Sequence, residues 1–204
     1  MGVISNGTTL LDAGALDSGI ATGAMTLIKT ITASSSANVT FAHGASSVVL
    51  NNTYASYLIK YINVHPSENG EQLKINFRDG STAYDATKTT TFFRAIHNEA
   101  GNDTELAYRT AQDLQNGTGT AHLTQGLGTD GDQSASGELM LFAPSSTTFV
   151  KHFIATTNTY SDDDYNYTTF VSGYCNVTAA IDGVQFTMSS GNIDSGTFKL
   201  YGIK

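Results

Sequence analysis

Short segments in which every second residue is apolar recur along most of this chain. In residues 72–77 and 184–188 the apolar side chains keep a strict period of two. That period is typical of a β-strand with one buried face, so we expect Phe186 to point into a core. The run 54–64 is apolar and aromatic almost throughout and predicts a strand buried on both faces. Further strands are predicted at 25–32, 38–42, 48–50, 87–96, 137–143, 148–156, 168–177 and 198–202.

Turns rich in Gly, Asn and Asp separate these segments, and the chain contains 20 glycines but only 2 prolines. Many short strands between such turns predict an all-β fold, namely an antiparallel β-sandwich that spans residues 25–204. A jelly-roll-like sandwich is our first expectation. An immunoglobulin-type sandwich comes second, because the Cys and Trp residues that pin that fold are missing. One short helix is expected within 99–114, where several residues have helical spacing.

Two segments are candidate binding loops. Residues 115–136 are rich in Gly, Thr and Asp and form the longest predicted loop, which makes Asp130 and Asp132 candidate contacts. The acidic turn at 162–164 is flanked by tyrosines that could stack on a sugar or dock a partner protein. Packing inside the sandwich is the favoured alternative for these rings. The candidate tyrosines are Tyr160, Tyr165 and Tyr167.

Residues 1–24 differ from the rest, because small polar residues surround isolated apolar ones. This pattern predicts an extended N-terminal arm that could add backbone hydrogen bonds to the sheet of a neighbouring protein. A frayed terminus is the alternative. The arm's candidate partner-binding residues are Leu10, Leu11, Leu16 and Ile20.

Composition and charge narrow the classes of partner. Charged residues make up 14% of the chain and the net charge is −8, with the basic residues scattered singly. Nucleic acid is therefore not an expected partner, since binding to phosphates needs clustered Lys and Arg. No apolar run approaches the ~20 residues of a membrane span, and the first residues lack the pattern of a signal peptide. Cys175 is the single cysteine, which fits synthesis in a reducing cytoplasm.

Candidate catalytic and metal-binding groups are dispersed. The 5 histidines lie far apart in the sequence, and the Asp residues at 130–132 and 162–164 lack the spacing of a calcium loop. Neither a nucleophile elbow nor a phosphate-binding glycine loop is present. The sequence therefore predicts a non-catalytic protein without a cofactor or a metal.

Three segments carry a resemblance to a known group of proteins. The segment YINVHP at 61–66 resembles an F-x-N-I-H-P motif of uncharacterised virion proteins of tailed bacteriophages, and 5–12 and 184–204 are similar to the start and end of those proteins. The resemblance implies a structural protein of the virion, made in the host cytoplasm and assembled as a homo-oligomer, with a trimer favoured. A capsid decoration (cement) protein on the major capsid protein is preferred. A tail fibre or adsorption protein that binds a host receptor or glycan is the alternative, since no fibre shaft is visible.

Overall fold

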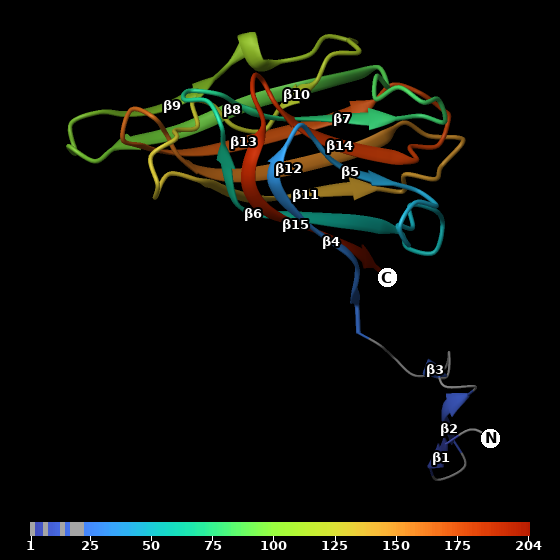
Figure 1. The fold of residues 1–204 in the computed structure, drawn as a ribbon. Coiled ribbons are helices and arrows are strands. Elements are labelled where there is room, and N and C mark those ends of the chain that lie inside the picture. Colours follow the sequence, from blue (N-terminus) through green and yellow to red (C-terminus); the bar gives the residue numbers. More distant parts are fainter. Residues whose placement is uncertain (1–2, 6–7, 13–14, 17–22) are drawn as a thin grey trace.

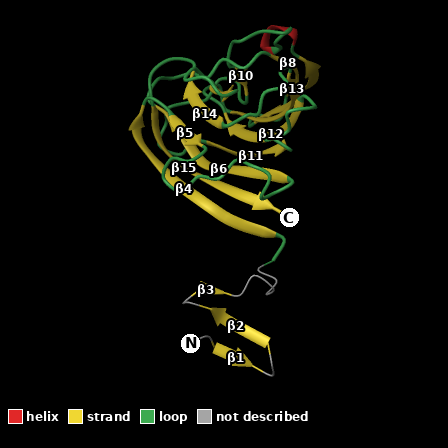
Figure 2. Cartoon of the chain, turned by 90° about the vertical axis from the view of Figure 1, so that its right-hand side faces the viewer, coloured by secondary structure: helices red, strands yellow, loops and turns green. Residues whose placement is uncertain are grey.

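Residues 23–204 form two antiparallel β-sheets that pack face to face (Figures 1 and 2). The structure, a computed structural model, describes residues 3–5, 8–12, 15–16 and 23–204. The larger sheet has eight strands, in the order β4 (Met25–Ser36), β15 (Ile193–Ile203), β6 (Ser56–Pro66), β11 (Ala135–Phe142), β12 (Lys151–Tyr160), β13 (Tyr165–Cys175), β8 (Lys88–Asn98) and β9 (Thr104–Tyr108). The smaller sheet has four, in the order β10 (Ala121–His122), β7 (Leu73–Arg78), β14 (Gly183–Met188) and β5 (Val39–Ala42).

The strand order follows the path of a jelly roll. Going forward, the chain alternates between the sheets through β4, β5, β6 and β7, and it returns through β10, β11, β14 and β15. Each returning strand pairs antiparallel with its forward counterpart, which gives the pairs β4·β15, β5·β14, β6·β11 and β7·β10. A long hairpin wrapped in this way defines the jelly roll. The expected all-β, jelly-roll-like sandwich is therefore confirmed.

Two hairpins inserted into this path widen one sheet. Strands β8 and β9 lie between β7 and β10 in the sequence, and β12 and β13 lie between β11 and β14. All four join the larger sheet beyond β11. The smaller sheet, with its four strands, therefore lies opposite only part of the larger one.

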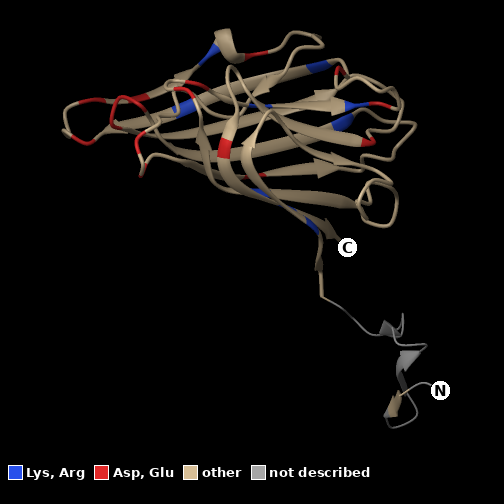
Figure 3. Cartoon of the chain, viewed as in Figure 1, with Lys and Arg blue, Asp and Glu red and all other residues tan. Residues whose placement is uncertain are grey.

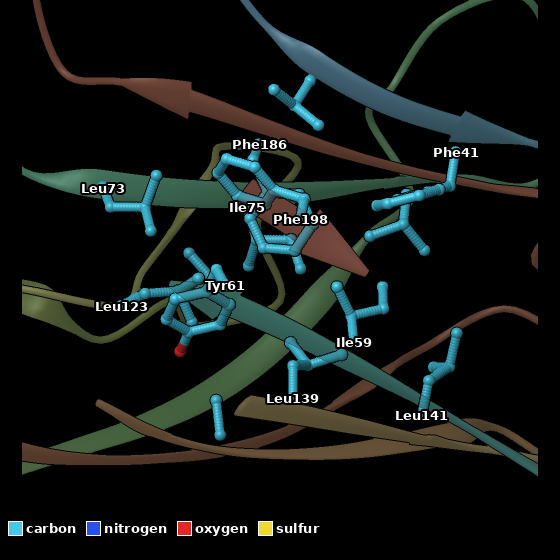
Figure 4. Packing of buried hydrophobic residues seen from close by; sticks show 14 of the residues in the cluster. Phe41, Ile59, Tyr61, Leu73, Ile75, Leu123, Leu139, Leu141, Phe186 and Phe198 are labelled. Atoms are coloured by element: carbon cyan, nitrogen blue, oxygen red, sulfur yellow. The ribbon is translucent and has the colours of Figure 1, made fainter. Parts of the chain in front are cut away.

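Aromatic residues from both sheets meet in the core (Figure 4). Phe186 on β14 has no exposed surface, and its ring centroid lies 5.1 Å from Phe198 and 5.9 Å from Tyr61 on the larger sheet. Val184 and Met188 are buried beside it on the same face of β14. The inward direction predicted for Phe186 is confirmed. The prediction for the 54–64 run is correct only in part, because Ile62 on β6 is 38% exposed.

The middle of the segment predicted as a long binding loop, around residues 121–128, packs against the core. Leu123 and Leu127 are fully buried, and the carbonyl of Leu123 accepts a hydrogen bond of 2.6 Å from the Thr169 hydroxyl on β13. The segment also contains β10. Its apolar residues cover the inner face of the inserted strands, which would otherwise face water. Its start, around residues 115–119, and its portion near Asp130 and Asp132 stay at the surface.

The helix predicted within 99–114 is wrong. This segment instead forms β9, which pairs with β8, and a single 3₁₀ turn at Thr110–Gln112. The Asn98 side chain fixes the hairpin, because its oxygen accepts hydrogen bonds from the backbone N–H groups of Asn102 and Asp103. Leu106 is 77% exposed, so a helix here would have had no apolar face to bury. The strand predicted at 48–50 is also absent, although Val48 and Leu50 are buried in a loop.

Three short strands precede the sandwich. They are β1 (Val3–Ser5), β2 (Thr8–Asp12) and β3 (Ala15–Leu16), which pair antiparallel with one another and with neither sheet of the sandwich. Figure 1 shows them apart from the sandwich. The predicted division into an arm (1–24) and a sandwich domain (25–204) stays a prediction.

Two buried lysines, Lys88 and Lys151, donate hydrogen bonds to loop carbonyls at one edge of the inner face of the larger sheet. Lys88, Cys175 and Lys151 face one another across β8, β13 and β12. The Lys151 ammonium donates hydrogen bonds to the carbonyls of Ser146, Val177 and Ala179, and that of Lys88 donates to Gly119. Burial raises the pKa of the Cys175 thiol to about 12. The thiol is therefore protonated and unreactive at neutral pH, as suits a core residue.

His122 should make the fold sensitive to mild acid. Burial lowers its pKa to about 4, helped by the charge of Lys74 on the paired strand β7, and its buried Nδ1 has no hydrogen-bond partner. An unfolded chain binds the proton near pH 6.5 and the folded chain does not. The contribution of neutral His122 is therefore fully present above about pH 6.5 and is lost as the pH drops toward 4; because the ring is only partly buried, the loss should be about 1–2 kcal/mol. Urea unfolding should show this loss in the wild type and a smaller one in His122→Gln. Equal losses in both proteins would contradict the assignment.

Candidate functional site

The outer face of the larger sheet carries a patch of exposed apolar side chains. This face points away from the smaller sheet, so its side chains are not buried in the core. The Phe93 and Phe170 rings stack at 4.9 Å between β8 and β13, although these side chains are 40% and 36% exposed. Ile154 on the neighbouring strand β12 is 53% exposed. We call Phe93, Tyr108, Met140, Ile154 and Phe170 the outer apolar patch.

The register of the strands explains why these side chains gather. Phe170 pairs with Phe93, and Phe93 pairs with Tyr108 on β9, so three aromatic residues form one row across the sheet. In the next row Ile154 pairs with Met140. Paired residues point to the same face of a sheet. Phe170 pairs with Thr156, two residues from Ile154 on β12, so Ile154 is its diagonal neighbour and joins the two rows.

Few charges interrupt this face. Lys60 on β6 and Glu138 on β11 pair across the strands with an N–O distance of 3.6 Å, and Lys199 on β15 lies beside Lys60 in the register. Aromatic residues and Met in a charge-poor setting are the composition of the buried centre of protein–protein interfaces. A contiguous apolar patch on a soluble domain marks such an interaction site. The outer apolar patch can therefore bind another protein surface.

A polar hollow of about 510 Å³ lies at the start of β15 and the end of β6. Its wall includes Asn63 and His65 from β6, Asp194 and Ser195 from β15, and the loop that contains Asp132. The His65 ring contacts both sides, because Nε2 lies 3.2 Å from the Asp130 carbonyl and Nδ1 lies 3.8 Å from the Asp194 carboxylate. This hollow can accept a small polar ligand.

The two predicted loop contacts, Asp130 and Asp132, differ in their position relative to the polar hollow. The Asp132 side chain is exposed and lines the polar hollow. Asp130 does not line it with a side chain, but its carbonyl contacts His65 and its backbone N–H donates to the Gln133 side chain at 3.1 Å. Asp130 therefore shapes the loop, and Asp132 is the residue available to a ligand.

The three predicted tyrosines lie at strand ends instead of in a loop. Tyr160 ends β12, and its hydroxyl donates to Asp164 at 3.3 Å; burial together with the charges of Glu99 and Asp164 raises its pKa to about 12. Tyr165 begins β13 and its hydroxyl donates to Asp103 at 2.9 Å. These contacts hold neighbouring turns together at an end of the sandwich where acidic side chains gather (Figure 3).

Tyr167 is not a surface contact. Its side chain faces inward and is 7% exposed, with the Arg94 guanidinium 4.9 Å from the ring centroid. Residues of a strand alternate between faces, so the register of β13 sends Tyr167 inward with Thr169 and Val171. Packing, which was the favoured alternative for the tyrosines, is therefore the role of Tyr167.

The predicted arm contacts are placed only by their backbone. Leu10 and Leu11 belong to β2 and Leu16 belongs to β3, where Leu11 pairs with Leu16. Ile20 lies outside the described residues. The strand pairing given for β2 and β3 does not bring Leu10, Leu11 or Leu16 to the polar hollow or to the outer apolar patch.

Of the residues that line the hollow, the sequence singled out only Asp132 as a candidate contact. His65 and Asp194 lie on neighbouring strands, but a long stretch of sequence separates them. Only the strand order brings them together, and single-sequence spacing cannot reveal that order. The adjacent phenylalanines at 92 and 93 were visible as part of a strand, but which of them faced water was not.

The residues that the structure describes contain neither a metal-binding group nor a membrane-spanning helix. Within residues 3–5, 8–12, 15–16 and 23–204, no group of three or more His, Cys, Asp or Glu side chains is placed to hold a metal ion. The same residues contain no helix of the length and apolarity that a membrane crossing requires.

Comparisons with known proteins give no relative from which a function could be transferred. No family model, curated protein or solved structure matches the chain.

Proposed function

We propose that this chain is a non-catalytic structural protein of a tailed-phage virion, and specifically a decoration protein that binds the lattice of the major capsid protein. The observation that supports this proposal best is the outer apolar patch, with Phe93, Phe170 and Ile154 exposed on the charge-poor face of the larger sheet. Jelly rolls are frequent among viral capsid domains, which favours the same conclusion by analogy of fold.

Binding energy that is summed over many copies is the proposed mechanism. A protein–protein interface of about 1,600 Å² can hold one copy on a shell. Assembly as a homo-oligomer, with a trimer favoured, would engage several such interfaces at once and raise the avidity without new contacts. The net charge of −8 makes nucleic acid an unfavourable partner for this protein.

A tail adsorption protein is the second candidate. The polar hollow beside His65 favours it, because a concave site with converging polar groups can recognise a receptor or a glycan. In that case the outer apolar patch would hold the chain in the tail and the hollow would face the host.

The N-terminal arm is expected to strengthen attachment to the particle. A chain that lacks residues 1–22 keeps Ala24, whose carbonyl accepts a hydrogen bond from the Lys204 backbone N–H at 3.0 Å. We expect this variant to melt at the temperature of the full chain but to co-sediment poorly with particles that lack the protein, because strand addition to a neighbour is lost. Equal co-sedimentation of the two chains would remove the arm from the mechanism.

A further inference from the structure

The polar hollow is formed by irregularities at the same level of three neighbouring strands. The pairing of β6 with β11 shifts between Ala135 and Gly137, and that of β6 with β15 shifts on both sides of Ser195. Asn63 adopts a left-handed backbone with φ of 51° in this region, and Gly196 has φ of 143°. Bulges of this kind bend strands and redirect side chains, and they are frequent beside binding sites. The left-handed Asn63 also stores local strain, which is a common property of ligand sites.

The loop that closes the hollow is held in place by a buried amide. Gln133 is 3% exposed; its Nε2 donates to the Ser161 carbonyl at 3.1 Å, and its Oε1 accepts the backbone N–H of Asp130 at 3.1 Å. His65 joins the same loop to Asp194 on β15. The wall is therefore set before any ligand arrives, which lowers the entropic cost of binding.

The lining defines the chemistry of the ligand. Asp132 and Asp194 offer carboxylates, Asn63 an amide, and Ser134 and Ser195 hydroxyl groups. Among the described residues neither Lys nor Arg lines the hollow, so the carboxylates of Asp132 and Asp194 would repel an anionic ligand such as a phosphate without a fixed positive charge to offset them. Phe, Tyr, Trp and large aliphatic side chains are also missing from the lining among the described residues, so an apolar ligand would gain little.

We propose that the polar hollow binds a sugar residue that carries no negative charge. Adjacent sugar hydroxyls can each donate to a carboxylate and accept from a serine, which matches the acceptor-rich wall. A volume of about 510 Å³ lies in the range of small-ligand sites. All residues of the site belong to this chain, so the proposal does not depend on the place of the protein in the particle. A decoration protein could use the site to capture host or environmental glycans, and an adsorption protein could use it to bind a receptor.

Saturation-transfer NMR on the purified full chain tests the proposal, with galactose, N-acetylglucosamine, glucosamine and sialic acid as separate probes. We expect signals from at least one neutral or amino sugar and none from sialic acid. Competition between probes then separates a neutral ligand from a cationic one. A sialic acid signal alone, or no signal from any probe, would overturn the proposal.

Two variants locate the binding. No atom lies within 4 Å of the Cβ position of Gly131, so Gly131→Trp can fill the hollow without a clash at the backbone. Asp132→Asn removes one carboxylate at an exposed position. We expect the first to abolish the sugar signal and the second to weaken affinity by about tenfold. Asp163→Asn is the matched control, because it removes an exposed carboxylate outside the hollow. Unchanged binding in both Gly131→Trp and Asp132→Asn would place the sugar elsewhere and contradict the proposal.

Discussion

Replacing Phe186 by Asp should unfold the protein or leave it barely stable. The side chain has no exposed surface and contacts Phe198 and Tyr61 across the two sheets. An aspartate there would bury an unpaired carboxylate and remove aromatic packing, at a combined cost of more than about 4 kcal/mol. The total free energy of unfolding of a typical domain is only about 5–15 kcal/mol. Circular dichroism during urea unfolding measures the loss.

Two further substitutions separate the effect of the core from the effect of the strand. Phe186→Leu keeps an apolar side chain and should cost about 1–3 kcal/mol. Thr187→Asp places the same charge one residue away on the other face of β14, beside Lys74 on β7, and should cost less than about 1 kcal/mol. If Phe186→Asp unfolds at the same urea concentration as Thr187→Asp, the jelly-roll core is assigned incorrectly.

The second large effect is expected on attachment to particles. Ile154→Lys puts a charge within the outer apolar patch, between Phe170 on β13 and Met140 on β11, where a partner surface would have to desolvate it. Changes at the centre of an interface often cost about 2–4 kcal/mol, so binding should weaken by at least about 30-fold. The residue is 53% exposed, so the melting temperature should hardly change. Co-sedimentation with particles that lack the protein measures the affinity.

Phe149→Lys is the matched control for this substitution. Phe149 is 73% exposed but lies in the loop between β11 and β12, outside the outer apolar patch. It should bind particles as tightly as the wild type. Equal weakening by both substitutions would indicate a general effect of positive charge. Full binding by Ile154→Lys would show that the patch is not the interface.

The sequence was informative wherever one face of a strand meets the core. Phe186 was predicted to point inward from the period-two pattern alone, and it is fully buried. The all-β class and the jelly-roll-like sandwich also followed from strand length and turn composition. These features depend on the local sequence pattern, because a strand with alternating apolar residues can bury them on only one face.

Features that depend on long-range pairing could not be predicted. Residues 99–114 have helical spacing, but pairing with β8 provides their backbone hydrogen bonds and makes β9 a strand. Residues 115–136 have the composition of a surface loop. Leu123 and Leu127 are nevertheless buried, because they pack on the inner face of the inserted strands, which the smaller sheet does not cover. The hollow likewise appears only when β6, β11 and β15 lie side by side.

The central claim is that this chain is part of the virion, and immunogold labelling of intact particles tests it most directly. Particles would be purified from cells that express the chain from its native locus, labelled with an antibody against the sandwich, and viewed by electron microscopy. The proposed function predicts label spread over the head. Label confined to the tail tip would support the adsorption alternative. Particles without label, from cells in which the chain is abundant, would contradict a virion role altogether.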